Sequence, residues 1–361
     1  MTNTGLPSGP TVEETSLPAW WTYRGTGQPL DRPLSEVLPP PPSWRDFHGG
    51  PVQPPPSDDP MEHDRRLGAV GGSVIRQDER EIDLINAALL LRRPLLVTGL
   101  PGIGKSTLAH RIARELRLGR VLHWSITSRS SLHGGLYDYD AIGRAQAAAA
   151  RRPVLAGEAV GHVRDDAEPD IGKFLRLGPL GTALLPYDLP RVLLIDELDK
   201  SDVDLPNDLL HVFEDGEFPI PELARIKEQA STVKVLTDDP DGTATVVNGW
   251  VRCRAFPFVV VTSNGEREFP PAFLRRCLQL RLTPPDESQL AAMVAAHFRA
   301  EADPHRHLIH QFAERSQNVG GLATDQLLNA IYLTTSGACD LDRAAGQHLL
   351  DAIWHELSGS P

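Results

Sequence analysis

A glycine-rich turn near residue 100 carries the residue types that bind phosphate. In the segment VTGLPGIGKSTLAHRI (97–112), Gly99, Gly104, Lys105 and Ser106 stand at the G-x-x-x-x-G-K-[ST] spacing without a mismatch. Glycines let backbone N–H groups turn inward around phosphates, lysine reaches the outer phosphates, and the serine hydroxyl can join the shell of a Mg²⁺ ion. The nucleotide-contacting positions expected here are Gly99, Pro101, Gly102, Ile103, Gly104, Lys105, Ser106 and Thr107.

The surroundings of this turn decide between a phosphate-binding loop and a chance glycine turn. The short apolar run PLLVTG precedes it and is typical of a buried strand. After Lys105, the apolar residues Leu108, Ile112 and Leu116 recur at helical spacing. A helix that begins here would direct the positive end of its dipole at a bound anion. This strand–turn–helix context favours the phosphate-binding loop.

An acidic pair follows a second apolar run. In RVLLIDELDKSD, four apolar residues (192–195) lead into Asp196 and Glu197, at the carboxyl edge where parallel sheets place their ligands. Asp196 would hold Mg²⁺ through water, and Glu197 would orient or deprotonate an attacking water. The alternative is a strand that ends in solvated acids. Behind a matched phosphate loop, the pair favours nucleotide hydrolysis.

Two further segments could complete such a site. Asn264 ends the apolar run VVVTSN, where its amide could hold the water or contact the outer phosphate; the alternative is a turn-forming asparagine before Gly265. Arg275 and Arg276 precede another expected strand in FPPAFLRRCLQL. A guanidinium stabilises the developing charge of phosphoryl transfer, also when a neighbouring subunit supplies it. The alternative is a pair of surface arginines that balance an acidic chain.

Composition limits the class of protein. The chain has 361 residues, 40% of them hydrophobic, which is enough for one large or two modest domains. Its net charge of -12 argues against a protein that coats nucleic acid without sequence preference. The three cysteines form no metal-ligand pattern, and no apolar run approaches the roughly 20 residues needed to span a bilayer. The acidic N-terminus lacks the apolar core of a signal sequence, so we expect a reduced, cytoplasmic protein.

The chain divides into three expected parts. Residues 1–65 hold nearly half of the 32 prolines and half of the six tryptophans. They predict a largely disordered arm whose aromatic motif PAWWTYRGTG docks either on a partner or on its own body. Residues 66–284 alternate helices with strands, expected at 94–98, 120–127, 191–197, 256–264 and 277–282, which predicts an α/β domain with a parallel sheet flanked by helices. After Pro284 and Pro285, residues 285–361 predict a small all-helical domain.

The phosphate loop, the acidic pair and the two later segments, in this order, resemble the AAA+ ATPases. GLPGIGKST corresponds to Walker A, LLIDELDKSD to Walker B, VVVTSN to sensor 1 and PPAFLRRC to the arginine-finger region. LYDYDAIGRAQ and LHVFEDGEFPIPEL are similar to segments of the MoxR-like group, and the resemblance covers about residues 70–345. It implies a P-loop NTPase domain with a helical lid and Mg²⁺-dependent ATP hydrolysis. It also implies a hexameric ring in which a neighbour's arginine completes the site, and a protein partner, often with a von Willebrand factor A-type domain.

Two inserted segments and one missing arginine bear on the resemblance to the AAA+ ATPases. Residues 161–188 would carry a helix-2 insertion, and residues 221–256 a hairpin with DDPDG at its tip; each either lines the pore or is structural padding. The lid's usual sensor-2 arginine is missing, because Thr324, Asp325 and Gln326 stand in its place and Arg315 lies upstream in the wrong register. Lid closure on the γ-phosphate should then be weaker, and turnover slow or dependent on a partner.

Several functions fit these observations. The first is an oligomeric ATPase that remodels or activates a protein partner. The second is an ATP-gated regulatory or assembly switch of a bacterial conflict or defence system, which the aromatic arm and the missing sensor-2 arginine favour slightly. A nucleic-acid-directed motor is disfavoured by the net charge and by the lack of a recognisable DNA-binding module. Transfer to a small-molecule acceptor fits Glu197 and Asn264 less well than water activation does.

Overall fold

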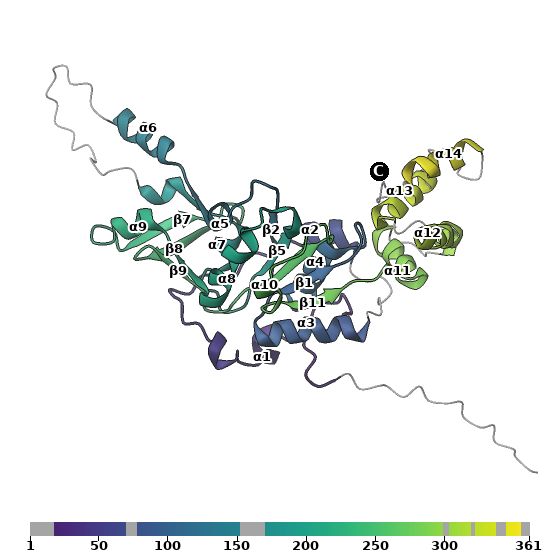
Figure 1. Ribbon diagram of the computed structural model, residues 1–361, viewed down its shortest axis with the longest axis horizontal. Helices are drawn as coiled ribbons and strands as arrows, with labels where there is room; N and C mark the ends of the chain where they lie inside the picture. The colour runs from purple at the N-terminus through teal and green to yellow at the C-terminus, as the bar shows by residue number, and fades with distance from the viewer. Residues whose placement is uncertain are drawn as a thin grey trace, which may run out of the picture.

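A parallel sheet forms the centre of the computed structural model, which describes residues 18–69, 78–151, 170–298, 303–318, 322–336 and 344–354 (Figure 1). Its five strands are β1 (Leu95–Thr98), β2 (Leu122–Ser125), β5 (Val192–Asp196), β10 (Phe258–Ser263) and β11 (Leu278–Arg281). They follow the order β11-β1-β10-β5-β2, and every neighbouring pair is parallel. The predicted strands are thereby confirmed. Because β1, β10 and β5 are adjacent, the segments that follow them meet at one edge of the sheet.

Helices cover both faces of this sheet. α3 (Glu79–Leu91) and α4 (Lys105–Leu116) pack on one face, and α7 (Pro179–Ala183) and α8 (Leu205–Asp215) pack on the other. Successive residues of β5 alternate between the two cores: Val192 and Leu194 face α3 and α4, whereas Leu193 and Ile195 face α7 and α8. Burial on both faces explains why β5 and β10 read as uninterrupted apolar runs in the sequence.

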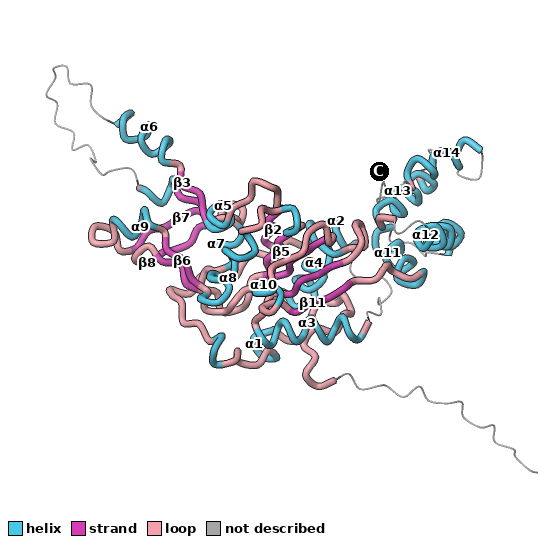
Figure 2. Tube along the Cα trace, in the orientation of Figure 1, coloured by secondary structure: helices cyan, strands magenta, loops and turns pink. Residues whose placement is uncertain are grey.

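A second sheet of six short strands lies beside the first (Figure 2). Its order is β3 (Tyr137–Tyr139), β4 (Leu175–Leu177), β7 (Thr232–Leu236), β8 (Thr243–Val247), β9 (Trp250–Arg252) and β6 (Glu217–Pro219). The predicted hairpin is confirmed as β7–β8. The strands β3, β4 and β6 have three residues each, too few for a sequence pattern to reveal them. The helices α5 (Leu132–Leu136), α6 (Ala141–Arg151) and α9 (Pro221–Arg225) belong to this part, and α6 projects away from the body.

The tip of the β7–β8 hairpin is anchored to the body. Asp239 accepts hydrogen bonds from both Nη atoms of Arg191, each at 2.8 Å, and the Arg191 side chain is fully buried. Arg120 approaches Asp238 to 3.0 Å from the same side. Of the two interpretations of this insert, these contacts favour a structural role for the tip. Residues 161–169 of the other insert lie outside the described residues.

The described residues after Pro285 are helical, as predicted. They form α11 (Glu287–Phe298), α12 (Arg306–Asn318), α13 (Thr324–Thr335) and α14 (Ala344–Ile353), with the short turn η4 (Asp303–His305) between α11 and α12. These helices, called the lid below, bury a core of their own that includes Leu290, Phe312, Leu327 and Trp354. The lid lies at one end of the molecule (Figure 1). Within the described ranges, no helix combines the length and the apolar character needed to cross a bilayer.

Residues 18–69, called the strap below, correct one prediction. They are ordered and packed on the body rather than largely disordered, and they include α1 (Leu34–Val37), η1 (Ser43–Arg45) and α2 (Pro60–Leu67). Tyr23 is completely buried and Trp21 nearly so, in the core formed with α3 and α4. The proline-rich sequence cannot build a core of its own, but the body supplies one. Of the two docking alternatives, the strap's own body is the one observed. Residues 1–17 lie outside the described residues.

Two buried polar side chains of the body hold the start of the strap. Asn86 Oδ1 accepts the N–H groups of Thr22 and Tyr23, each at 2.8 Å, and its Nδ2 donates to Tyr23 O at 2.7 Å. The Glu115 carboxylate accepts hydrogen bonds from the backbone and one hydroxyl of residues 24–27. Neither Asn86 nor Glu115 is exposed. An extended segment cannot satisfy its own N–H groups, so these side chains take the place of a strand partner.

Candidate functional site

The residues of the phosphate loop form a turn between β1 and α4. Gly99, Gly102 and Gly104 have φ angles of 153°, 74° and 93°, which favour glycine. A Cβ at Gly99 would lie 2.9 Å from the backbone carbonyl oxygen of Leu282, so this position also needs glycine for space. α4 begins at Lys105 directly after the turn, and its first backbone N–H groups have no partner within the helix. This geometry fits a phosphate cradle.

The Lys105 ammonium group is folded over this turn. Its Nζ donates to Gly99 O at 2.9 Å and to Leu100 O at 2.7 Å. Burial lowers the pKa of this amine, and nearby carboxylates, Asp199 foremost, oppose the shift. Phosphate oxygens are charged acceptors and would bind the same ammonium group more strongly than carbonyl oxygens do.

Asp196 ends β5 beside the loop, where side chains from three elements contact it. Its Oδ1 accepts hydrogen bonds from Ser106 Oγ at 2.7 Å and Thr262 Oγ1 at 2.6 Å, and His123 Nε2 lies 3.3 Å from Oδ2. Burial alone would raise the pKa of Asp196. The hydrogen bonds from His123, Thr262 and Ser106 outweigh burial and bring the pKa to about 2. Asp196 is therefore ionised at neutral pH.

These oxygen atoms fit Mg²⁺. The ion is commonly bound by one or two carboxylates, substrate phosphates and water rather than by a complete protein cage. Ser106 and Asp196 supply a hydroxyl and a carboxylate that are already in contact. Across the part of the chain that the structure describes, no group of three or more His, Cys, Asp or Glu side chains could hold a metal ion. Phosphate oxygens and water would complete the shell of an ion held by Ser106 and Asp196.

Glu197 lies next to this pair in a strained backbone conformation. Its φ of 61° is uncommon for a residue with a side chain, and its N–H donates to Thr262 Oγ1 at 2.8 Å. Its Oε1 accepts from Asn264 Nδ2 at 3.3 Å, and its Oε2 pairs with Lys200 Nζ at 2.8 Å. The structure thus brings Glu197 and Asn264 together, with the Glu197 side chain 41% exposed and accessible to water.

The sequence motifs do not mark four side chains of the site: Asp199, Lys200, Thr262 and His123. Asp199 is buried and accepts the N–H groups of Asn264 and Glu266, so it fixes the segment after β10. Lys200 restrains Glu197, as described above. Both belong to the charged segment ELDKSD, so their charge was an available signal. Thr262 and His123 stand in strands where nothing in the local pattern distinguishes them.

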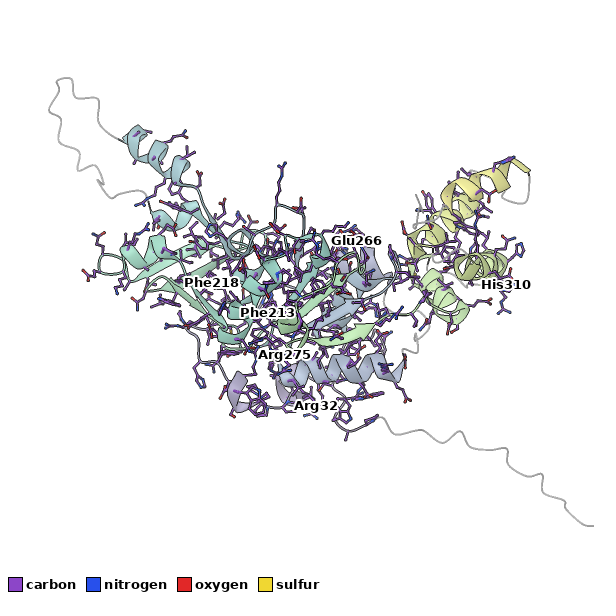
Figure 3. All side chains as sticks on the ribbon, in the orientation of Figure 1. Arg32, Phe213, Phe218, Glu266, Arg275 and His310 are labelled. Carbon is purple, nitrogen blue, oxygen red and sulfur yellow. The ribbon has the colours of Figure 1, made fainter. Side chains whose placement is uncertain are left out.

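Arg275 and Arg276 lie away from this site. They precede β11 and so lie at the amino edge of the sheet, whereas the loop and Asp196 lie at the carboxyl edge. A strand of this length spans roughly 13 Å. In Figure 3, Arg275 is well separated from Glu266, which stands two residues after Asn264. The structure therefore does not bring the arginine pair to the site of its own chain.

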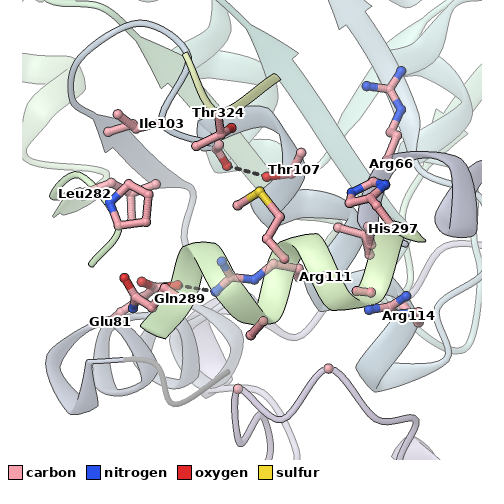
Figure 4. Close-up of a pocket in the computed structure, with 18 of the residues that line it drawn as sticks. Arg66, Glu81, Ile103, Thr107, Arg111, Arg114, Leu282, Gln289, His297 and Thr324 are labelled. Carbon is pink, nitrogen blue, oxygen red and sulfur yellow. Dashed lines mark hydrogen bonds and ion pairs between the residues drawn. The ribbon is translucent and has the colours of Figure 1, made fainter. Parts of the chain in front are cut away.

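A cavity of about 590 Å³ adjoins the phosphate loop (Figure 4). Ile103 and Thr107 line it from the loop and α4, Leu282 from the segment after β11, and His297 from α11. Residues 25–28 of the strap line it as well. Its volume lies within the usual range for small-molecule sites, roughly 300–1,000 Å³. The cavity offers space for the base and ribose of a nucleotide whose phosphates occupy the loop.

The lid contacts the phosphate loop through Thr324. The N–H and the Oγ1 of this residue both donate to Gly102 O, at 3.0 and 3.1 Å. Asp325 lines the cavity beside it. Arg315 instead pairs with Asp351 inside the lid at 2.6 Å, as its unsuitable register predicts. Residues 319–321 of the expected sensor-2 segment lie outside the described residues.

Replacement of Thr324 by valine should loosen the lid. Valine preserves the shape but removes one of the two donors to Gly102 O, a contact worth about 0.5–1.5 kcal/mol. We expect the affinity for ATP to fall between about twofold and tenfold, as measured by titration with a fluorescent nucleotide. Thr335→Val is the matched control, because the Thr335 hydroxyl bonds only within α13. An unchanged affinity would show that the Thr324 hydroxyl does not stabilise the closed lid.

Comparisons with known proteins give only distant likenesses. No known protein family matches the sequence, and no curated protein matches it significantly. Among solved structures, RuvB of Thermotoga maritima, titled a Holliday junction branch migration motor, is 15% identical with a TM-score of 0.37, over 80% of this chain and 72% of RuvB. NtrX of Brucella abortus, in complex with ADP, is 15% identical with a TM-score of 0.33, over 73% of this chain and 51% of NtrX. At these TM-scores neither likeness carries an argument about function.

Proposed function

We propose that this chain is an AAA+ ATPase of the MoxR-like group that hydrolyses ATP with Mg²⁺. One observation supports this proposal more than any other. The Ser106–Asp196 contact brings the two expected Mg²⁺ ligands together beside Lys105, and the Glu197–Asn264 pair lies next to them. A phosphate loop alone would account for nucleotide binding. The adjoining carboxylate and amide add a place for an attacking water.

Each group has one role in this proposal. Lys105 and the backbone N–H groups of the loop bind the phosphates, and Ser106 and Asp196 hold Mg²⁺, which neutralises phosphate charge. Glu197 Oε1 accepts a proton from the attacking water, while the Asn264 amide orients that water. The Thr262 hydroxyl contacts Asp196 and the Glu197 backbone, and so fixes the two acids relative to each other.

The position of the arginine pair supports a shared site. Because Arg275 and Arg276 lie at the opposite edge of the sheet from their own phosphate loop, their guanidinium groups could serve the site of another subunit but not that of their own chain. We therefore propose a homo-oligomer, a hexameric ring as the resemblance implies. Its work would be to remodel or activate a protein partner, with a von Willebrand factor A-type protein as the expected kind.

A regulatory switch with slow hydrolysis is the second candidate, and the surroundings of Glu197 favour it. The ion pair with Lys200 occupies one carboxylate oxygen of Glu197. The lid reaches the loop with the Thr324 hydroxyl, which cannot neutralise γ-phosphate charge as an arginine would. Both features would slow turnover and still permit ATP binding.

The ATPase rate per subunit, measured with Mg²⁺ against protein concentration, tests the shared site. We expect the specific rate to rise as rings assemble. It should fall by about 10³-fold or more in the double variant Arg275→Ala/Arg276→Ala, which should still bind ATP. Arg254→Ala, at an exposed ion pair with Asp188, is the control. A concentration-independent rate that the double variant retains would mean a self-contained site. Tight ATP binding without turnover in the unmodified chain would favour the switch.

A further inference from the structure

One strap residue lies between two helix ends. Arg45, in η1, is 7% exposed. Its Nη1 donates to Phe213 O at 2.7 Å and to Glu214 O at 3.3 Å, in the last turn of α8, and its Nη2 donates to Arg92 O at 2.9 Å, where α3 ends. Carbonyl groups at helix C-termini lack partners within the helix and attract cations. One guanidinium group thus joins the ends of two helices that are far apart in the sequence.

Aromatic packing fixes the orientation of this guanidinium group. Its central carbon lies 4.2 Å from the ring centre of Phe256 and 5.2 Å from that of Phe47. Such contacts favour an arginine over a lysine, because the planar group stacks and donates along two directions at once. The side chain is therefore held by its surroundings as well as by its hydrogen bonds.

The same two helix ends contact the segment that carries the arginine pair. Glu214, whose carbonyl accepts from Arg45, forms an ion pair with Arg276 through its carboxylate. Directly after α3, Arg93 Nη1 donates to Arg275 O at 3.3 Å. The helix α10 (Pro271–Leu274), which leads into Arg275, also contacts α8. A short series of contacts therefore runs from Arg45 through the ends of α8 and α3 to Arg275 and Arg276.

We propose that Arg45 is a positioning residue for the arginine pair, so that the strap of one subunit supports hydrolysis in the next. This inference rests on the proposed shared site. Arg45 bonds to helix ends and not to the phosphate loop or the acidic pair of its own chain. It sets the separation of the ends of α8 and α3, and these set where the guanidinium groups of Arg275 and Arg276 stand. A misplacement of a reacting or stabilising group by about 1 Å can cost about a hundredfold in rate.

Mixed rings test this proposal, because a positioning role acts on the neighbour and a general loss of stability does not. Lys105→Ala subunits keep the arginine pair but cannot hold phosphate; Arg275→Ala/Arg276→Ala subunits keep the site but lack the pair. A mixture of the two should recover ATPase activity.

Arg45→Lys is then added to one kind of subunit at a time. In the Lys105→Ala subunits, which donate the arginines, it should lower the recovered rate by about 10- to 100-fold. In the subunits that lack the pair, it should leave the recovered rate unchanged.

The outcomes separate the two claims. If the basic mixture recovers no activity, the shared site itself is wrong. If it recovers activity and Arg45→Lys lowers the rate equally in both kinds of subunit, or in neither, Arg45 has no positioning role.

Arg32→Lys, at an exposed arginine of the strap, is the matched control and should change neither mixture. Glu214→Gln replaces a half-exposed side chain and should fold even if Arg45→Lys does not. It should show the same one-sided loss, and a symmetric or absent effect would equally overturn the proposal.

Discussion

Glu197→Gln is expected to lower the ATP turnover rate by about 10²- to 10⁴-fold and to leave ATP affinity unchanged. Glutamine has nearly the same shape as glutamate and can keep the contact with Asn264 Nδ2, but it cannot accept a proton from water. Lys105, Ser106 and Asp196, which would bind the phosphates and Mg²⁺, are untouched. Single-turnover hydrolysis and a competition assay with a fluorescent nucleotide measure the two quantities separately.

The control for this variant is Asp204→Asn, which neutralises an exposed acid at the start of α8 that caps no N–H group. It should retain both turnover and affinity. A Glu197→Gln protein that turns over at the normal rate would mean that another group activates the water. A matching loss of affinity would mean that Glu197 supports the bound nucleotide rather than the chemical step.

Glu115→Ala is expected to detach the first part of the strap and to destabilise the fold by about 3 kcal/mol, the upper end for buried groups that lose a hydrogen-bond partner. The carboxylate is completely buried and accepts the donors of residues 24–27, none of which has a strand partner. Its removal leaves these mostly half-buried donors without their acceptor and leaves a gap where the side chain stood. Urea unfolding should show the loss of stability, and limited proteolysis should show new cleavage between residues 18 and 40.

Glu115→Gln should have a smaller effect, because the amide oxygen can still accept some of these hydrogen bonds. Glu36→Ala, which removes an exposed ion pair of the strap with Arg32, serves as the control and should change little. If Glu115→Ala unfolds at the same urea concentration as the unmodified protein, the strap is held by Asn86 and by apolar burial instead. In that case cleavage between residues 18 and 40 should stay slow.

The sequence predicts those parts of the fold whose determinants are local. The phosphate loop follows from the spacing of Gly99, Gly104 and Lys105, and β5 and β10 follow from apolar runs that are buried on both faces. The closeness of Asp196 to Asn264 follows from the rule that parallel strands place their carboxyl ends along one edge of the sheet. These inferences need no knowledge of what packs against the sheet.

The strap shows why other parts could not be predicted. Its burial depends on Asn86 and Glu115, which are over sixty residues away along the chain and stand inside helices, where a polar residue usually faces water. The three-residue strands β3, β4 and β6 form by pairing with segments elsewhere in the chain: β3 pairs with β4, β4 with β7, and β6 with β9. The contact between Thr324 and Gly102 likewise depends on how the lid sits on the body.

The prolines of the strap affect how it responds to force. A proline ring fixes φ, so a segment such as LPPPP (38–42) loses little conformational entropy on attachment and bends little once attached. Residues 25–28 line the cavity of the strap's own subunit, and Arg45 holds the two helix ends that contact the arginine pair. A slack linker between these two points would absorb a shift at the first. A stiff one would transmit it to the second, so in the proposed ring the strap would link the cavity of one subunit to the site of the next.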